Sequence, residues 1–383
     1  MISEKLSPMD RFEAVCADPY GLARAAAAQG HRIAGYMNSQ APEELLHAGG
    51  YFPVRTFGFT DGTQLADGLL QSYACTVARG ALNLMLSGGV DFLDVMVFPH
   101  TCDTVQNLTD IWKRNTDQMR VFALSMPVCM TGESAVRFLC EEFGRLRGFL
   151  EEECGAITDD AIRASMELYE RHRAAMRRLY VLRRTNPGCI SAADVLKVVL
   201  ASCLMRKEDH LPLLEALVQD VEAREPAQAD ARPRVFVAGN VVQRPEYLAA
   251  IEHAGCVVVD DELCTGSRAF NFEPVGCDDP LESLARMYLA RPPSPSKHRP
   301  GFHAGRYLVG RAQAAAADGL IFLLTKFCDP WAFDYPHARE TLDAAGLPSL
   351  LLEIEQQPPP SGQFETRVAA FAEMLCANRK EHE

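Results

Sequence analysis

Short apolar runs separated by amphipathic stretches occupy the first and last thirds of the chain, whereas the middle third lacks them. The runs of strand length cover residues 31–37, 51–57, 91–99, 120–124, 234–239, 256–260, 319–326 and 348–354. Continuous apolar runs that alternate with helical stretches are typical of parallel strands buried on both faces. The pattern therefore predicts an α/β fold with parallel sheets.

The middle of the chain has helical character. Ser191 precedes the stretch AADVLKVVLASCLM, where its hydroxyl would cap a helix. The stretch EPAQADARP at residues 225–233 indicates a linker. We therefore expect three parts: an N-terminal helix with a first α/β domain in residues 1–132, a helical region in residues 133–228, and a second α/β domain in residues 229–383.

The two expected α/β domains repeat one another. In each, a strand precedes a helix that begins with Pro-Glu and ends with His-Ala-Gly, and a later strand precedes Cys-Asp. The matching positions are Pro42-Glu43 with Pro245-Glu246, residues 47–49 with 253–255, and Cys102 with Cys328. Proline at a helix start and an acidic residue in the first turn suit helix geometry and dipole. We therefore predict two flavodoxin- or Rossmann-like parallel-sheet domains related by an internal repeat.

Charge and hydropathy narrow the possible partners. The chain of 383 residues has a net charge of −13, which argues against nucleic-acid binding through a basic face. Its longest apolar runs are too short to cross a bilayer, and residues 1–15 lack the basic start and apolar stretch of a secretory signal. We therefore expect a cytoplasmic protein that binds neither nucleic acid nor membrane.

The chain contains 13 cysteines and no CxxC motif. Disulfides are disfavoured in the cytosol, so the thiols are expected to be buried, catalytic or metal-binding. The lack of CxxC excludes the zinc-ribbon, thioredoxin and ferredoxin signatures. Any metal site must therefore gather its ligands from distant parts of the chain.

Cys102 and Cys328 each follow an expected strand and precede an expected helix. Ligands of open parallel sheets bind beyond the carboxyl ends of the strands, and a helix N-terminus stabilises a thiolate. If the two halves face each other, these cysteines meet across the cleft, and Cys75, at the start of another helix, joins them. Three thiolates suit a zinc ion with an open position or a [4Fe-4S] cluster with one iron not held by cysteine. Buried apolar thiols are the alternative that the residues leave open.

Several segments together resemble one protein family. They are GYMNSQAPEELLHAGGYFPVR, QSYACTVARGALNL, DFLDVMVFPHTCDTVQNLTDIWK, DDELCTGSR, FCDP and GQFETRVAAFAEML. With this combination the chain resembles the benzoyl-CoA reductase/2-hydroxyacyl-CoA dehydratase family from about Gly35 to Leu375. The resemblance implies two flavodoxin-like domains, a helical region and a [4Fe-4S] cluster between the domains. The cluster cysteines of the family fall on Cys75, Cys102 and Cys328.

The resemblance also implies one-electron chemistry on a CoA thioester. A separate ATP-hydrolysing iron–sulfur activator supplies the electron, and transfer to the thioester carbonyl gives a ketyl radical. Aryl-CoA reductases use this radical to dearomatise a ring, and 2-hydroxyacyl-CoA dehydratases use it to expel a hydroxyl group. The stretch CDTVQNLTDIWK favours the smaller, cluster-bearing subunit of a benzoyl-CoA-type reductase. The first hypothesis is therefore the iron–sulfur subunit of an ATP-dependent aryl-CoA reductase.

Three alternatives stay open: a 2-hydroxyacyl-CoA dehydratase subunit, a stand-alone reductase with a double-cubane cluster, and a non-catalytic electron-relay subunit. The expected partners are an acyl-CoA or aroyl-CoA substrate, the activator, and a homologous subunit in a heterodimer or a second copy in a homodimer. The sequence has no GxxxxGK[ST] and no GxGxxG after a strand, which agrees with ATP hydrolysis on a partner.

Three residues are candidates for catalysis. Ser39 lies in a loop that the resemblance puts near the thioester, so its hydroxyl either donates to the carbonyl or belongs to the cap of the next helix. Glu43 is either a general acid or base or a carboxylate that satisfies the helix dipole. His100, two residues before Cys102, either donates to the cluster region or packs within its loop.

A further thiol and several cations complete the candidates. Cys264 is either a fourth thiol near the site, as a larger double cluster would require, or a structural residue. Four basic residues are candidates for binding CoA phosphates, or else are solvated surface groups: Arg268, Arg306, Lys297 and His298. Cys203 and the other cysteines in helical contexts are expected to be ordinary thiols.

Overall fold

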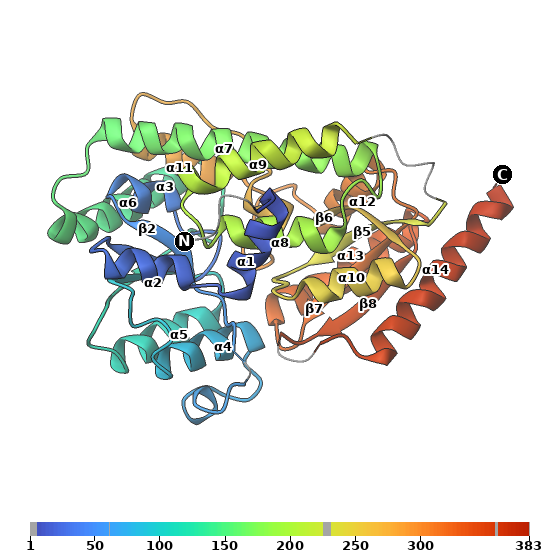
Figure 1. The fold of residues 1–383 in the computed structure, drawn as a ribbon, viewed down its shortest axis with the longest axis horizontal. Coiled ribbons are helices and arrows are strands. Elements are labelled where there is room, and N and C mark those ends of the chain that lie inside the picture. The colour runs from blue at the N-terminus through green and yellow to red at the C-terminus, as the bar shows by residue number, and fades with distance from the viewer. Residues whose placement is uncertain (1–5, 61, 225–230, 357–358, 383) are drawn as a thin grey trace.

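The computed structural model describes residues 6–60, 62–224, 231–356 and 359–382. These residues form two four-stranded parallel sheets that are joined and covered by helices (Figure 1). The predicted α/β class, with two parallel sheets and a helical region, is confirmed. Of the expected linker, residues 225–230 lie outside the described part of the chain.

The two sheets have the same strand order. In the first sheet the order is β2-β1-β3-β4, and in the second it is β6-β5-β7-β8. The strands are β1 (Ile33–Tyr36), β2 (Phe52–Arg55), β3 (Val95–Pro99), β4 (Arg120–Leu124), β5 (Arg234–Gly239), β6 (Val257–Glu262), β7 (Gly319–Thr325) and β8 (Ser349–Ile354). Counted within each half, both orders are 2-1-3-4, which begins the flavodoxin-like order 2-1-3-4-5. The predicted internal repeat is therefore confirmed.

Helices connect the strands and form a separate layer. The first half contains α1 (Pro8–Ala17), α2 (Gly21–Ala28), α3 (Glu43–Ala48), the short η1 (Ala66–Gly68), α4 (Thr76–Leu86) and α5 (Asp103–Arg114). The helical region contains α6 (Glu133–Cys154), α7 (Asp159–Thr185), α8 (Ala192–Ser202) and α9 (Lys207–Glu222). The second half contains α10 (Pro245–His253), η2 (Ser267–Ala269), α11 (Pro280–Ala290), α12 (Ala304–Ala314), α13 (Asp329–Ala344) and α14 (Gly362–His382).

Local sequence accounts for these elements. The strands β1, β3 and β7 are buried along their whole length, as their apolar composition predicts. Helix α1 begins with a capping box in which Ser7 and Asp10 satisfy each other's backbone amides. The predicted cap of α8 is also present, because Ser191 Oγ accepts a hydrogen bond of 3.0 Å from the Asp194 amide.

Helix α7 joins the two halves. It runs along one side of the molecule together with α9, and it contacts α3 of the first half and β6 of the second (Figure 1). Arg173 of α7 forms a buried ion pair of 2.5 Å with Glu44 of α3. Ten residues later, Arg183 forms another buried ion pair of 2.8 Å with Asp261 of β6. The helical layer is thus anchored to each sheet domain by a charge pair that is shielded from water.

One helix departs from the simple three-part organisation. Helix α11 follows β6 in sequence, yet it packs against α6 and α7. Phe272 and Tyr288 of this segment share a hydrophobic core with residues of the first sheet, such as Tyr36 and Val97. The expected boundary at residue 229 therefore stays a prediction, and the segment around α11 gives the first half one of its walls.

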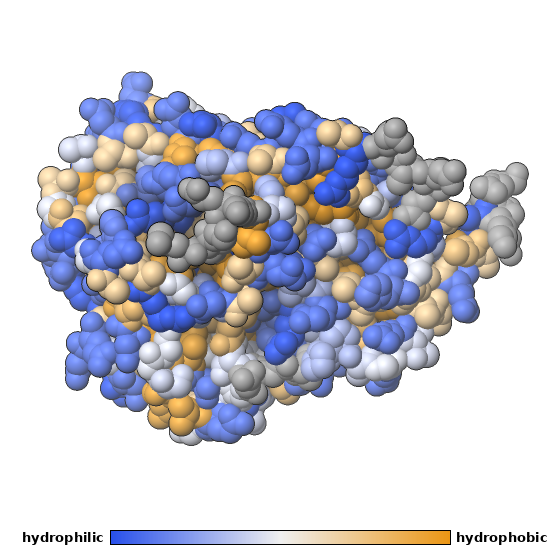
Figure 2. Space-filling model, in the orientation of Figure 1, coloured by the Kyte–Doolittle hydropathy of each residue, from blue (hydrophilic) through white to orange (hydrophobic). Residues whose placement is uncertain are grey.

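The surface is largely polar. Figure 2 shows hydrophilic side chains over most of one face, with apolar groups scattered among them and gathered at the lower tip of the first half. The segment between β2 and α4 forms this tip and contributes the exposed side chains of Leu65, Leu69 and Tyr73. None of the helices in the described residues is long and apolar enough to span a bilayer.

Candidate functional site

A cavity of about 140 Å³ lies where the carboxyl ends of both sheets meet. Parallel sheets bind ligands at this edge. The walls come from both halves of the chain. The lining residues with polar or sulfur atoms include Asn38, Ser39, Arg55, Cys75, Thr101, Cys102, Asn240, Cys264, Arg268, Ser294, Ser296 and Cys328.

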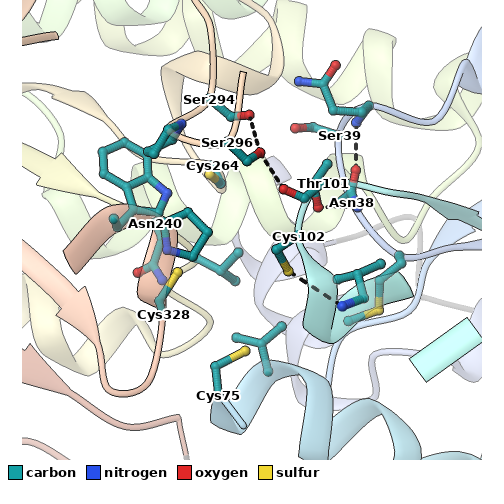
Figure 3. A pocket seen from close by; sticks show the side chains of 18 of the residues that line it. Asn38, Ser39, Cys75, Thr101, Cys102, Asn240, Cys264, Ser294, Ser296 and Cys328 are labelled. Atoms are coloured by element: carbon teal, nitrogen blue, oxygen red, sulfur yellow. Dashed lines mark hydrogen bonds between the residues drawn. The ribbon is translucent and has the colours of Figure 1, made fainter. Parts of the chain in front are cut away.

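The three cysteines predicted to act together all line this cavity. Figure 3 shows the sulfur atoms of Cys75, Cys102 and Cys328 around a common space, two from the first half and one from the second. Each cysteine is the N-cap residue of a helix: Cys75 of α4, Cys102 of α5 and Cys328 of α13. Cys102 Sγ accepts a hydrogen bond of 3.5 Å from the amide of Val105. Three helix dipoles therefore point their positive ends at the same space.

Without a cation these thiols hold their protons. Burial raises the pKa of Cys102 to about 11 and that of Cys328 to about 12. The Cys75 thiol raises both pKa values further, and Cys102 also raises that of Cys328. Burial also raises the pKa of Cys75, although the amides of Ala78 and Val77 oppose the shift. A positively charged group bound to all three sulfurs would lower their pKa values, because a metal ligand must be a thiolate.

The spacing of the donors bears on the kind of metal group. Within the described residues, no three side chains of His, Cys, Asp or Glu lie close enough together to hold one metal ion. The thiolates of a [4Fe-4S] cluster bind different irons, so they stand farther apart than the ligands of one ion. Three sulfurs around a shared cavity, each beside helix amides, are a donor set that fits an anionic cluster.

Of the three catalytic candidates, Ser39 is the one that lines the cavity. Its carbonyl oxygen accepts a hydrogen bond of 2.6 Å from Arg291, which fixes the loop. The cap of α3 is Pro42, and no side chain caps that helix, so Ser39 has no capping role. Its side chain lines the cavity, where a ligand could contact it.

Glu43 and His100 lie outside the lining of this cavity. Glu43 pairs with Lys207 at 3.0 Å and lines a smaller neighbouring cavity, which Ser39 also borders. Burial lowers the pKa of His100, and its Nε2 is buried with no hydrogen-bond partner in the described part of the chain. Neither side chain reaches the space between the cysteines directly.

The basic candidates differ in their surroundings. Arg268 lines the cavity, but it pairs with Glu262 at 3.0 Å and donates to the carbonyls of Pro292 and Pro293. Lys297 donates to the carbonyls of His100 and Met126, at 3.3 and 3.1 Å. Both cations thus hold the Pro-rich loop of residues 291–301 against the site. His298 and Arg306 are exposed and do not line the cavity.

Several lining residues escaped the sequence analysis. The Pro-rich loop adds the hydroxyls of Ser294 and Ser296, and Ser296 donates to the carbonyl of Thr101. Asn240 follows β5 and reaches the cavity beside Cys328 (Figure 3). The internal repeat carried a signal for Asn240, because Asn38 stands at the equivalent strand end in the first half. Cys264 also lines the cavity, which agrees with the first of its two alternatives, a thiol near the site.

Fold and site together define an α/β protein with two parallel sheets, in which cysteines from both halves converge on one cavity. The chain belongs to the family described as 2-hydroxyglutaryl-CoA dehydratase, D-component, whose model matches residues 38–375. The family resemblance expected from the sequence is confirmed, and with it the expectation of an enzyme subunit.

Individual relatives cover nearly the whole chain. It is 28% identical over 347 residues to the (R)-phenyllactyl-CoA dehydratase beta subunit of Clostridium sporogenes, covering 90% of this chain and 92% of the relative. It is 30% identical over 353 residues to the lactoyl-CoA dehydratase subunit beta of Anaerotignum propionicum, covering 90% and 92%. It is 28% identical over 351 residues to a benzoyl-CoA reductase subunit of Thauera aromatica, covering 90% and 91%.

Proposed function

We propose that this chain is a cluster-bearing subunit of an enzyme that performs one-electron chemistry on an acyl-CoA thioester. Cys75, Cys102 and Cys328 would hold a [4Fe-4S] cluster. The observation that carries the proposal is that all three cysteines, each at a helix N-terminus, line one cavity between the halves. When bound, the cluster would supply single electrons at low potential.

The protein's own residues would prepare the site for this chemistry. The helix N-termini at the three cysteines favour a negatively charged group in the cavity. The Pro-rich loop, held by Arg268 and Lys297, closes one side and limits access of water. Ser39 would orient the thioester carbonyl by donating a hydrogen bond. Glu43 and His100 stay candidates for proton transfer through groups or water between them and the cavity.

Two reactions fit this proposal. The first is the reduction of an aryl-CoA by an ATP-dependent reductase, supported by the similarity to the benzoyl-CoA reductase of Thauera aromatica. The second is the dehydration of a 2-hydroxyacyl-CoA, supported by the similarity to two dehydratase beta subunits. In both, we propose a homologous subunit and an ATP-hydrolysing iron–sulfur activator as partners, and a cytoplasmic location.

The cluster is tested by iron and acid-labile sulfide analysis after strictly anaerobic purification, with EPR of the dithionite-reduced protein. We expect about four irons and four sulfides per chain. About eight irons would replace this proposal with a double cluster that includes Cys264. A chain without iron would overturn it.

The reaction is tested with the anaerobically assembled complex of this chain, its homologous subunit and the activator. The complex is given ATP, a reductant and either benzoyl-CoA or a 2-hydroxyacyl-CoA, and the products are separated by chromatography. A dearomatised thioester supports the reductase, and an enoyl-CoA supports the dehydratase. Turnover of neither thioester class would contradict both reactions.

A further inference from the structure

The side-chain amide of Asn240 has an unusually fixed orientation. Asn240 is 5% exposed and follows the last residue of β5. Its Oδ1 accepts hydrogen bonds from the amide and the hydroxyl of Thr325, at 3.1 and 2.9 Å. Thr325 ends β7 and stands three residues before Cys328. The amide oxygen of Asn240 therefore ties the end of β5 to the turn that carries Cys328.

A second amide holds this arrangement in place. Gln356 Nε2 donates to Thr325 Oγ1 at 3.1 Å and to the carbonyl of Val241 at 2.9 Å. Because two donors occupy the oxygen of Asn240, the opposite end of its amide, which carries only donors, is turned away from Thr325. Asn240 and Cys328 lie next to each other on the cavity wall (Figure 3).

The first half has a similar connection that does not involve sulfur. Asn38 Nδ2 donates to the carbonyl of Pro99 at 3.1 Å and to Thr101 Oγ1 at 3.3 Å. These residues precede Cys102, so Asn38 also ties the end of a first strand to the cysteine-bearing turn. The Nδ2 donor of Asn38 is therefore already paired with the two oxygen atoms of Pro99 and Thr101. Cys102 instead receives its hydrogen bond from the backbone amide of Val105.

We propose that Asn240 donates a hydrogen bond to the sulfur of Cys328 and thereby raises the reduction potential of the cluster. This inference rests on the proposed function, because it concerns the cluster assigned to Cys75, Cys102 and Cys328. A donor to a cluster thiolate stabilises the reduced state, which carries the larger negative charge. Asn240 is thus a positioning residue that acts through Cys328.

The test is a potentiometric titration, followed by EPR, of the wild type, Asn240→Leu and Asn38→Leu. Leucine has a similar volume and no donor, and neither change alters the charge. For Asn240→Leu we expect a lower potential, with roughly a tenfold smaller ratio of reduced to oxidised cluster at a fixed potential, or about 59 mV. We expect no shift for Asn38→Leu. Equal shifts in both variants, or no shift in Asn240→Leu at full iron content, would overturn the inference.

A second variant and a spectroscopic measurement distinguish the loss of the Asn240 hydrogen bond from misfolding. Asn240→Asp keeps the two acceptor contacts to Thr325 and replaces the donor with an oxygen, so it should lower the potential at least as much. In ENDOR spectra of the reduced wild type, an exchangeable proton of Asn240 should couple to the cluster and disappear in Asn240→Leu. Retention of that signal in Asn240→Leu would refute this inference and leave the proposed function standing. A wild-type chain without iron would overturn the proposed function together with it.

Discussion

The two α/β halves share a framework but deliver their cysteines in different surroundings. Both have the strand order 2-1-3-4, and in both a Cys-Asp pair follows the third strand and starts a helix. The first half supplies two thiols, Cys75 and Cys102, each beside backbone amides. The second half supplies Cys328, and Asn240 lies beside it on the cavity wall (Figure 3). A repeated framework can therefore fix where the cysteines stand while each copy adjusts their electrostatic surroundings.

The largest effect is expected when either half loses one of its cysteines. Cys102→Ala and Cys328→Ala should each abolish cluster binding, because each removes a ligand that the other half cannot replace. Iron and sulfide per chain and the EPR signal after anaerobic purification measure the loss. Cys203→Ala, a buried thiol outside the cysteine-lined cavity, is the matched control and should keep its iron. Equal iron content in all three variants would contradict the site.

The two buried ion pairs that anchor α7 should differ in how much they stabilise the protein. Arg173→Met should lower the free energy of unfolding by about 3–5 kcal/mol, because it leaves the buried carboxylate of Glu44 without its ion-pair partner. Arg183→Met should cost less, since Tyr180 still donates to Asp261 and Arg184 and Arg311 still pair with Asp260. Urea denaturation of the metal-free chain measures both. A larger loss for Arg183→Met would show that the second anchor is the stronger one.

The ion pair of Glu44 with Arg173 also makes the stability of the protein depend on pH. Burial opposes the charge of Glu44, but Arg173 and Arg291 lower its pKa below the ordinary value. Its contribution to stability is therefore complete above about pH 4.3, the pKa in the unfolded chain, and is lost as the pH falls through the lower folded pKa. In Glu44→Gln, the free energy of unfolding should fall less steeply below about pH 4.3 than in the wild type. Glu167→Gln, a change at an exposed position of α7, should follow the wild-type curve.

Much of this framework was predictable because it depends on local patterns. The apolar runs at 234–239 and 319–326 match β5 and β7 closely, whereas the run at 91–99 begins four residues before β3, where the chain turns. The Cys-Asp pairs after the strands located Cys102 and Cys328. The partners and directions of side-chain hydrogen bonds, by contrast, could not be predicted from the sequence. Arg268 read as a free cation, yet it pairs with Glu262 because β6 ends in a buried acidic run.

The smallest effect concerns the backbone at the cysteine of the second half. Phe327, which precedes Cys328, has a φ of 63°, and within the described residues the only other non-glycine residue with positive φ is Ala316. The left-handed conformation costs about 1–2 kcal/mol outside glycine. Phe327→Gly should remove this strain, and the greater freedom of glycine in the unfolded chain should offset about 0.4–1 kcal/mol of the gain.

The net effect of Phe327→Gly on urea stability should therefore be a gain of about 0–1.6 kcal/mol, with the iron content unchanged. Thr101→Gly, at the equivalent position before Cys102, is the control. Thr101 has no positive φ to relieve, so glycine there should only destabilise. The greater freedom of the unfolded chain should cost about 0.4–1 kcal/mol, and the lost hydrogen bond from Asn38 to Thr101 Oγ1 about 0.5–1.5 kcal/mol more. If Phe327→Gly also loses stability, Phe327 is unstrained in solution. The second half would then orient Cys328 through the contacts of Asn240 and Thr325, and not through a strained turn.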